Sequence, residues 1–235
     1  MKKIFSILLA AAIMFSLIAC SKPDVHDDVP DIIEEAAVKT VQTKQTRYES
    51  DGSISLWIEY EYDSDGNWTN GTWYKAEGSI SKSVDYEYDS DGNLAKSIEK
   101  DADGLFMGTS EHTYNSDGSL RGRRDYDADG KGKFNMSYTY DAWGNLIGAV
   151  AGSTRTSYTH EYDSAGNPLS SIVTGGTTVH YEYDANSELI QKTYNKADGA
   201  IEIAEYANGN IIKDTFYLSD GSVEYWFTYE YDIIQ

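Results

Sequence analysis

The feature that most constrains this chain is a repeat built around glycine. Tyrosines recur every 26 residues, at Tyr62, Tyr88, Tyr114 and Tyr140. Each begins a Tyr-Asp/Asn-x-x-Gly unit such as YDSDG, and a second, weaker set of units lies between them. The glycines of these units, at positions 52, 66, 78, 92, 104, 118, 130 and 144, therefore alternate in spacings of 14 and 12 residues. A fixed period of this size is typical of a repeat architecture, in which each unit packs mainly on its neighbours.

Each unit is expected to be the turn of a β-hairpin. A three-residue loop built on a type I turn needs a left-handed residue in third place, and glycine takes that conformation without steric cost. Asp63 can accept hydrogen bonds from its own turn, which favours the same geometry. The tyrosine four residues before each glycine should then face the apolar residue two after it, as Tyr62 faces Trp68.

Residue parity predicts the two faces of the sheet. Even-numbered apolar residues such as Ile58, Tyr60 and Tyr62 share one face, and odd-numbered Glu59 and Glu61 share the other, because strand side chains alternate with period two. After Pro168 the parity reverses. The content of 20 Gly and 20 Tyr, with no long helical periodicity, also indicates β structure. The sequence therefore predicts an all-β fold, an antiparallel β-meander of hairpin repeats that forms a curled or coiled sheet.

The acidic turns raise the alternative of a cation site. Asp63 with Asp65, or Asp89 with Asp91, could contribute oxygen ligands to calcium, but an EF-hand loop needs acidic ligands at five or six positions. The hairpin interpretation also explains YDSAG and YDAWG, which lack the second aspartate. We therefore expect no metal and no cofactor, and weak calcium binding between stacked turns stays open.

The first twenty residues indicate export. Two lysines precede an apolar run from Ile4 to Ala19, which is short for a membrane span and typical of a secretory signal. Leu17-Ile18-Ala19-Cys20 resembles the bacterial lipobox, and this resemblance implies that Cys20 carries the lipid. An ordinary signal peptide with an incidental cysteine is the alternative. We expect a lipoprotein signal peptide at 1–20, an acidic flexible tether at 21–37 and the repeat domain at 38–235.

The repeat units resemble the YD repeat of the Rhs family, roughly Tyr-x-Tyr-Asp-x-x-Gly-Asn-Leu. The match is most specific at YEYDSDGNW, YEYDSDGNL, YTYDAWGNL and HEYDSAGNPL. The resemblance implies antiparallel sheets that coil, display at the cell surface, and carbohydrate binding, which is commonly proposed for that family. It does not imply toxin delivery, because the chain is too short to form the shell of the giant members.

Charge and residue content exclude several functions. The formal net charge of −20 repels nucleic acid and anionic lipid head groups, so nucleic acid is not an expected partner. Membrane attachment is expected through the N-terminal lipid anchor, at the outer membrane or cell surface. The histidines His112, His160 and His180 lie in strands without a metal-binding or nucleophile spacing, and no carboxylate is buried by the pattern. We therefore expect a protein that is not an enzyme.

Four tryptophans are the candidate binding residues. Trp57 and Trp73 are odd-numbered and should project together from the polar face as direct cross-strand partners, whereas Trp143 lies in a turn and Trp226 lies off-phase. Exposed aromatic side chains can stack on sugars or anchor a protein partner. The sequence thus predicts a cell-envelope lipoprotein with a non-catalytic module that binds a glycan or a surface protein. A structural envelope spacer is the alternative. TWYKAEGSI also loosely resembles a choline-binding repeat.

Overall fold

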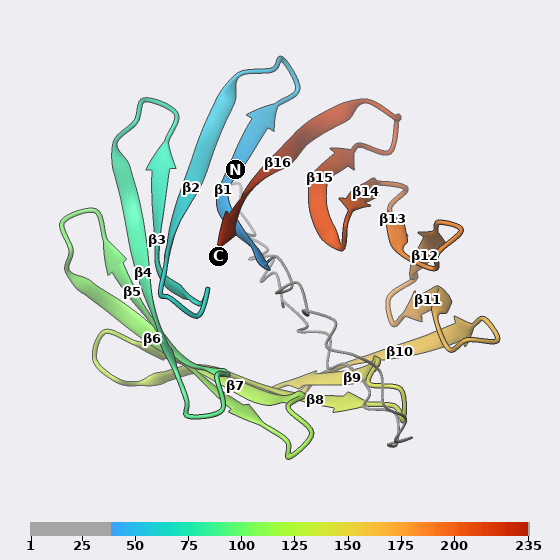
Figure 1. Ribbon diagram of the computed structural model, residues 1–235, viewed down its shortest axis with the longest axis horizontal. Helices are drawn as coiled ribbons and strands as arrows, with labels where there is room; N and C mark the ends of the chain where they lie inside the picture. The colour runs from blue at the N-terminus through green and yellow to red at the C-terminus, as the bar shows by residue number, and fades with distance from the viewer. Residues whose placement is uncertain (1–38, 235) are drawn as a thin grey trace, which may run out of the picture. The chain divides into compact units, whose positions relative to one another are not determined.

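The computed structural model describes residues 39–234, and these residues form sixteen antiparallel strands (Figure 1). The predicted signal peptide, Cys20 and the tether lie outside the described residues. The strands are β1 (Lys39–Glu49), β2 (Ile54–Tyr62), β3 (Trp68–Lys75), β4 (Ile80–Tyr88), β5 (Leu94–Asp101), β6 (Phe106–Tyr114), β7 (Leu120–Asp127), β8 (Gly132–Tyr140), β9 (Leu146–Ala151), β10 (Thr154–Tyr162), β11 (Pro168–Val173), β12 (Thr177–Tyr183), β13 (Leu189–Asn195), β14 (Ile201–Ala207), β15 (Asn210–Tyr217) and β16 (Val223–Ile234).

The strands follow one another as a meander, and the sheet closes on itself. β1 pairs with β16 along a ladder that runs from Lys39 opposite Ile234 to Glu49 opposite Tyr225. The predicted curled or coiled sheet is therefore wrong in its closure, although the all-β meander is confirmed. The physical reason is that an open sheet leaves two edges of unpaired backbone groups. Twist accumulates over sixteen strands, and pairing the two terminal strands satisfies both edges at once.

The turns have the predicted geometry. Gly66 adopts a φ of 76° and Gly92 a φ of 80°, both in the left-handed region. The Asp63 carboxylate accepts hydrogen bonds from the backbone N–H of Asp65 at 2.9 Å and of Asn67 at 2.8 Å. Asp89 makes the same two bonds in its own turn. These aspartates thus stabilise the loop that the glycine makes sterically accessible.

Replacing Gly92 by valine should lower the free energy of unfolding by about 1 kcal/mol or more. A Cβ at this position would meet no atom within 4 Å, so the cost arises from the left-handed backbone and not from a clash. The matched control, Asp91→Asn, keeps the glycine and should cost much less. Thermal denaturation of both variants measures the difference. Equal losses, together with a stabilisation by calcium that only the wild type shows, would favour a cation site instead.

A β-bulge follows most of the turns and resets the register of the strand, whereas the β9–β10, β11–β12 and β13–β14 ladders are regular. Tyr62 lies opposite Trp68, as predicted, but Glu61 lies opposite Asn70 because Thr69 is an extra residue. Trp57 therefore pairs with Tyr74, and Trp73 pairs with Ile58. The predicted Trp57–Trp73 pair is wrong. The two side chains lie on opposite faces of the sheet, because one inserted residue exchanges the faces of all the residues beyond it.

The repeat tyrosines occupy the concave, inner face of the barrel. Burial raises the pKa of Tyr229 in β16, and the nearby acidic groups of Asp214, Tyr231, Tyr60 and Tyr206 raise it further. Tyr60 and Tyr206 belong to β2 and β14, which each lie two strands away from β16 in the barrel. Side chains from such strands approach one another only on the face toward which the sheet curves. The side chains that alternate with these tyrosines form the outer face.

Among residues 39–234 there is no helix with the length and apolar content that crossing a membrane requires.

Candidate functional site

Several of the repeat tyrosines join neighbouring hairpins through their hydroxyl groups. Tyr114, Tyr140 and Tyr231 donate to the backbone carbonyls of Leu94, Leu120 and Ile211, at 2.9, 3.0 and 2.8 Å. Each acceptor lies two residues after the left-handed glycine in the turn of the preceding hairpin on the same rim of the barrel. Burial is the main cause that raises the pKa to about 12 in six such tyrosines, Tyr62, Tyr114, Tyr140, Tyr162, Tyr183 and Tyr231. This part of the tyrosine lining therefore has a structural role.

A buried carboxyl group lies on the same inner face. Asp214 in β15 is only 8% exposed, and its Oδ1 atom has no hydrogen-bond partner. Its cross-strand neighbours are Ala204 in β14 and Phe227 in β16. The pKa of Asp214 is raised to about 7, mainly by burial and in smaller part by Glu202, while Lys196 acts to lower it. A strongly shifted carboxyl group of this kind marks a candidate functional position. The expectation that no carboxylate is buried is wrong at this residue.

The inward position of Asp214 is hard to predict from the sequence, because the alternation breaks just before it. A bulge falls between Glu205 and Tyr206 in β14, where Tyr206 lies opposite Ile211 and Glu205 opposite Lys213. Ile212 is the extra residue and is 42% exposed, which turns Asp214 toward the inner face. Two consecutive isoleucines directly after a turn are the only local signal of this change of face.

A serine and a histidine also lie together on the inner face. The His160 Nδ1 atom is 2.6 Å from the Ser171 Oγ, and the His160 Nε2 atom is 2.7 Å from the carbonyl oxygen of Leu146. Ser171 in turn donates to the Tyr181 hydroxyl at 3.1 Å. Ser171 is only 1% exposed, and its hydroxyl group already has hydrogen-bond partners within the protein. The arrangement satisfies buried polar groups across β10, β11 and β12, and we assign it a structural role.

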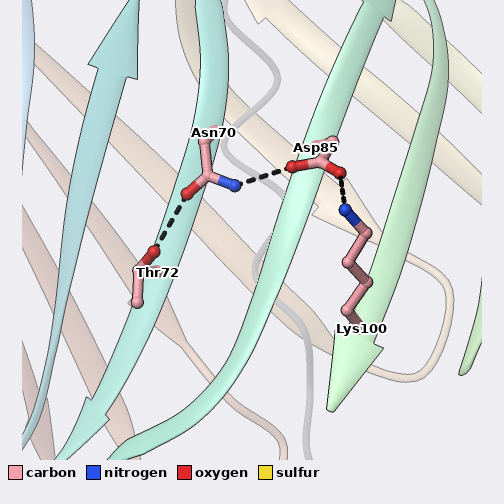
Figure 2. A network of polar contacts seen from close by, with 4 residues as sticks. All are labelled: Asn70, Thr72, Asp85 and Lys100. Atoms are coloured by element: carbon pink, nitrogen blue, oxygen red, sulfur yellow. Dashed lines mark hydrogen bonds and ion pairs between the residues drawn. The ribbon is translucent and has the colours of Figure 1, made fainter. Parts of the chain in front are cut away.

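The outer face carries a band of polar and charged side chains across β3 to β7. Figure 2 shows one network on it, in which Thr72 donates to Asn70 at 2.9 Å and Asn70 donates to Asp85 at 2.7 Å. Lys100 completes the network through an ion pair with Asp85. Burial alone would raise the pKa of Asp85, but the hydrogen bonds from Lys100 and Asn70 lower it below its usual value. A row of alternating charges continues across the next strands, with Glu87 opposite Lys96, Lys96 opposite Glu111 and Glu111 opposite Arg124.

The four candidate tryptophans do not form one surface. Trp57 and Trp226 lie on the outer face and stack on tyrosines, Trp57 on Tyr74 with ring centroids 5.0 Å apart and Trp226 on Tyr48 at 5.3 Å. Lys44 lies over the Trp57 ring at 5.7 Å. Because the protein's own side chains cover these ring faces, little of them remains for a sugar to stack on.

Trp73 packs on the inner face. A Cβ at Gly71 would lie 3.1 Å from its ring and 3.3 Å from the ring of Tyr60, so the glycine leaves room for both aromatic side chains. Lys82 lies over the Trp73 ring at 4.9 Å and forms an ion pair with Glu99 at 2.6 Å. Trp73 is therefore part of the packing of the wall.

Trp143 differs from the other three because it projects from a turn and is 67% exposed. Its ring contacts Tyr162 with a centroid distance of 4.9 Å and lies beside the next turn, where a Cβ on Gly166 would be 3.6 Å away. The Asp141 carboxylate fixes the turn by accepting the backbone N–H groups of Trp143 and Asn145, both at 2.9 Å. It also accepts the Tyr162 hydroxyl. The ring thus rests on a rigid support and presents its remaining surface to solvent.

The acidic turns themselves offer no multidentate site within the described strands and turns. No group of three or more histidine, cysteine, aspartate or glutamate side chains in residues 39–234 could hold a metal ion. In the turns at Asp63, Asp89 and Asp163, one carboxylate oxygen is shared by two backbone N–H groups. The aspartates thus act as turn-forming residues.

No family model matches the chain, and no curated protein matches it. Among solved structures, a porin-like protein from Bacteroides uniformis is similar at 14% identity and a TM-score of 0.43, over 85% of this chain and 93% of that one. A TcdB2–TccC3–Cdc42 complex is similar at 13% identity and a TM-score of 0.31, over 77% of this chain and 14% of that one. A Tc holotoxin pore from Photorhabdus luminescens gives 14% identity and 0.27, over 72% and 13%. At these TM-scores the likenesses carry no argument about this chain.

Proposed function

We propose that this protein is an exported, lipid-anchored envelope protein whose barrel binds a glycan without catalysis, with Trp143 as the stacking platform. The exposure of Trp143 is the observation that carries the proposal. Nearly all the other turns have a small or polar residue at the equivalent position, as in Asp65, Asp91, Asp103, Asp117, Asp129, Ala165, Asn186 and Asp220. The turn geometry therefore does not require an indole, and leaving so large an apolar group in water does not help folding.

The surroundings of Trp143 suit a sugar. Carbohydrates present apolar C–H faces that stack on aromatic rings, and hydroxyl groups that pair with carboxylate and amide side chains. The neighbouring turn holds Asp163, whose carboxylate accepts the Asn167 side-chain amide at 2.9 Å and so keeps both polar groups in fixed positions. An acidic protein has little attraction for anionic partners, so a neutral glycan is the class that fits best.

The composition of the outer face favours a barrel that is surrounded by water and lies outside the lipid bilayer. A barrel wall in contact with lipid needs an outward band of apolar residues. This wall instead carries Glu87, Glu111 and Arg124 exposed at the middle of its strands, and the repeat tyrosines lie on the inner face. The distribution favours attachment through the lipid predicted at Cys20, which lies outside the described residues.

A glycan array with the purified full-length chain tests this function. We expect Trp143→Asp to weaken binding at least tenfold, which corresponds to about 1.4 kcal/mol. Aspartate is the common residue at this turn position. The free energy of unfolding of the variant should therefore lie within about 0.5 kcal/mol of the wild-type value. Trp143→Tyr keeps an aromatic ring and should retain part of the affinity. A wild-type protein that binds no glycan, or a Trp143→Asp variant with unchanged binding, would contradict the proposal.

The structural spacer is a second candidate, and the tyrosine hydroxyl bonds between hairpins favour it. They make each hairpin stiffen the next, which suits a protein that holds a fixed distance. The same array separates the two functions, because a spacer binds no glycan and tolerates Trp143→Asp.

A further inference from the structure

The inner face around Asp214 has an unmatched negative charge. The Asp214 carboxyl group is more than nine-tenths buried, and one of its oxygens has no hydrogen-bond partner. A buried polar group without a partner is rare in folded proteins and is costly when it is charged. The unpaired oxygen of Asp214 requires an explanation. A bound ligand that pairs with this oxygen is one explanation.

Aromatic side chains surround this carboxyl group. Besides burial, its charge is among the causes that raise the pKa of Tyr194, Tyr206, Tyr225 and Tyr229, so it lies near four tyrosines on three strands. Phe227 is its cross-strand neighbour on one side, and the small Ala204 is its neighbour on the other. Tyrosine rings beside a carboxylate favour an organic cation, because the ring faces are negative and attract positive charge.

Cations of the protein itself already contact rings of this region. Lys192 lies between Tyr181 and Tyr206, at 5.6 and 5.4 Å from the ring centroids, and Arg47 lies over Tyr225 at 4.0 Å. Lys196 lies over Phe216 at 5.1 Å and forms an ion pair with Glu202 at 3.1 Å. The inner face thus binds cations on its rings, yet none of these groups makes a hydrogen bond to the Asp214 Oδ1 atom.

We propose that Asp214 is the anionic centre of an inner-face site for a small organic cation, with a protonated amine or quaternary ammonium group held against Tyr194, Tyr206 and Tyr229. The ammonium group supplies the positive charge that pairs with the Asp214 carboxylate, and the tyrosine rings exclude water around the pair. This chemistry differs from that of the glycan platform at Trp143, which lies in a turn at the rim, so either proposal can fail without the other.

The site has a built-in dependence on pH. The charged and titratable groups that face this region are Glu202 and Tyr206 in β14, Lys192 and Tyr194 in β13, Lys196 in the following turn, Tyr225 and Tyr229 in β16, and Arg47 in β1. Of these, Asp214 changes charge near neutrality, with a pKa of about 7. A bound cation requires the ionised form. We therefore expect binding to strengthen from pH 6 to pH 8.

Isothermal titration calorimetry of the full-length chain with tetramethylammonium and with n-butylammonium tests this site. Neopentyl alcohol, a neutral compound whose tert-butyl group approximates the shape of tetramethylammonium, tests for simple apolar binding. We expect at least one of the two cations to bind at pH 8, with tenfold or greater loss in Asp214→Asn and no binding of the alcohol. Asp129→Asn makes the same change of charge in an exposed turn and should leave the affinity unchanged.

Three results would overturn the proposal. They are the absence of binding of either cation to the wild type at pH 8, equal binding to Asp214→Asn, and an affinity that does not change between pH 6 and pH 8. Circular dichroism of Asp214→Asn confirms that the variant is folded, which we expect because asparagine removes a buried charge.

Discussion

The substitutions Gln45→Pro and Thr46→Pro should each lower the free energy of unfolding by about 3 kcal/mol or more. Both residues lie in the middle of β1, where Gln45 pairs with Tyr229 and Ile58, and Thr46 pairs with Thr228 and Trp57. Successive backbone N–H groups of a strand point to opposite sides. One of the two substitutions therefore removes a bond to β16 and the other a bond to β2. Urea denaturation of both variants measures the losses.

The pair of substitutions distinguishes a closed barrel from an open sheet. In an open sheet β1 would be an edge strand, and proline is tolerated where an edge N–H faces solvent. One of the two variants would then be nearly as stable as the wild type. Ser50→Pro is the matched control, because it places proline at the second position of the turn that ends with Gly52, where proline is favoured. It should have little effect.

Asp214→Asn should stabilise the protein most at pH 8, and progressively less as the pH falls toward 4. The pKa of Asp214 rises from 3.8 to about 7 on folding, mainly through burial, so the folded state holds its proton more tightly than the unfolded chain does. The stability that this group contributes is fully present below pH 4 and is lost as the pH rises through 7. A shift of this size corresponds to at most about 4 kcal/mol. We expect the variant to gain about 2 kcal/mol at pH 8.

Denaturation curves of wild type and variant at pH 5, 6, 7 and 8 test this expectation. The difference between the two proteins should grow as the pH rises and should level off above the pKa of Asp214. Asp129→Asn serves again as the exposed control and should show no such trend. A variant that loses stability at pH 8 would show that Asp214 is ionised and paired in the folded protein.

The hairpins could be predicted because their determinants are local. Glycine at position 66 or 92 takes the left-handed conformation, and aspartate at position 63 or 89 caps the turn, so the sequence of one unit contains the whole signal. The rim pairs follow from the same geometry. Tyr62 opposite Trp68 and Tyr88 opposite Leu94 are confirmed.

The faces beyond each turn could not be predicted by parity, because parity assumes a regular ladder. Thr69 is an extra residue in β3, and it moves Trp73 from the expected outer position to the inner face beside Tyr60. Ile212 has the same effect in β15, where it turns Asp214 inward. A bulge depends on how a turn joins the strand ladder that follows it. Residue parity alone therefore cannot predict which face a residue four positions beyond the bulge will occupy.

Closure could not be predicted because it depends on contacts between residues almost two hundred positions apart. Nothing within β1 identifies Tyr229 or Thr228 as a partner, and the repeat pattern is the same whether the sheet spirals or closes. The length of the terminal strands is the one feature that fits closure. β1 has 11 residues and β16 has 12, and no other described strand is as long.

The barrel is closed only if β1 and β16 are hydrogen-bonded neighbours, and a disulfide between these two strands would show that they are. Lys44 lies opposite Glu230, and the Cα atoms of such partners are about 4.5–5.5 Å apart, which permits a disulfide. In a Cys20→Ser background, Lys44→Cys with Glu230→Cys should form an intramolecular bond, detected by peptide mapping of the oxidised monomer. The control pair, Lys44→Cys with Glu161→Cys in β10, should form none. A seam pair that stays reduced in the folded monomer under the same oxidation would contradict the closed barrel.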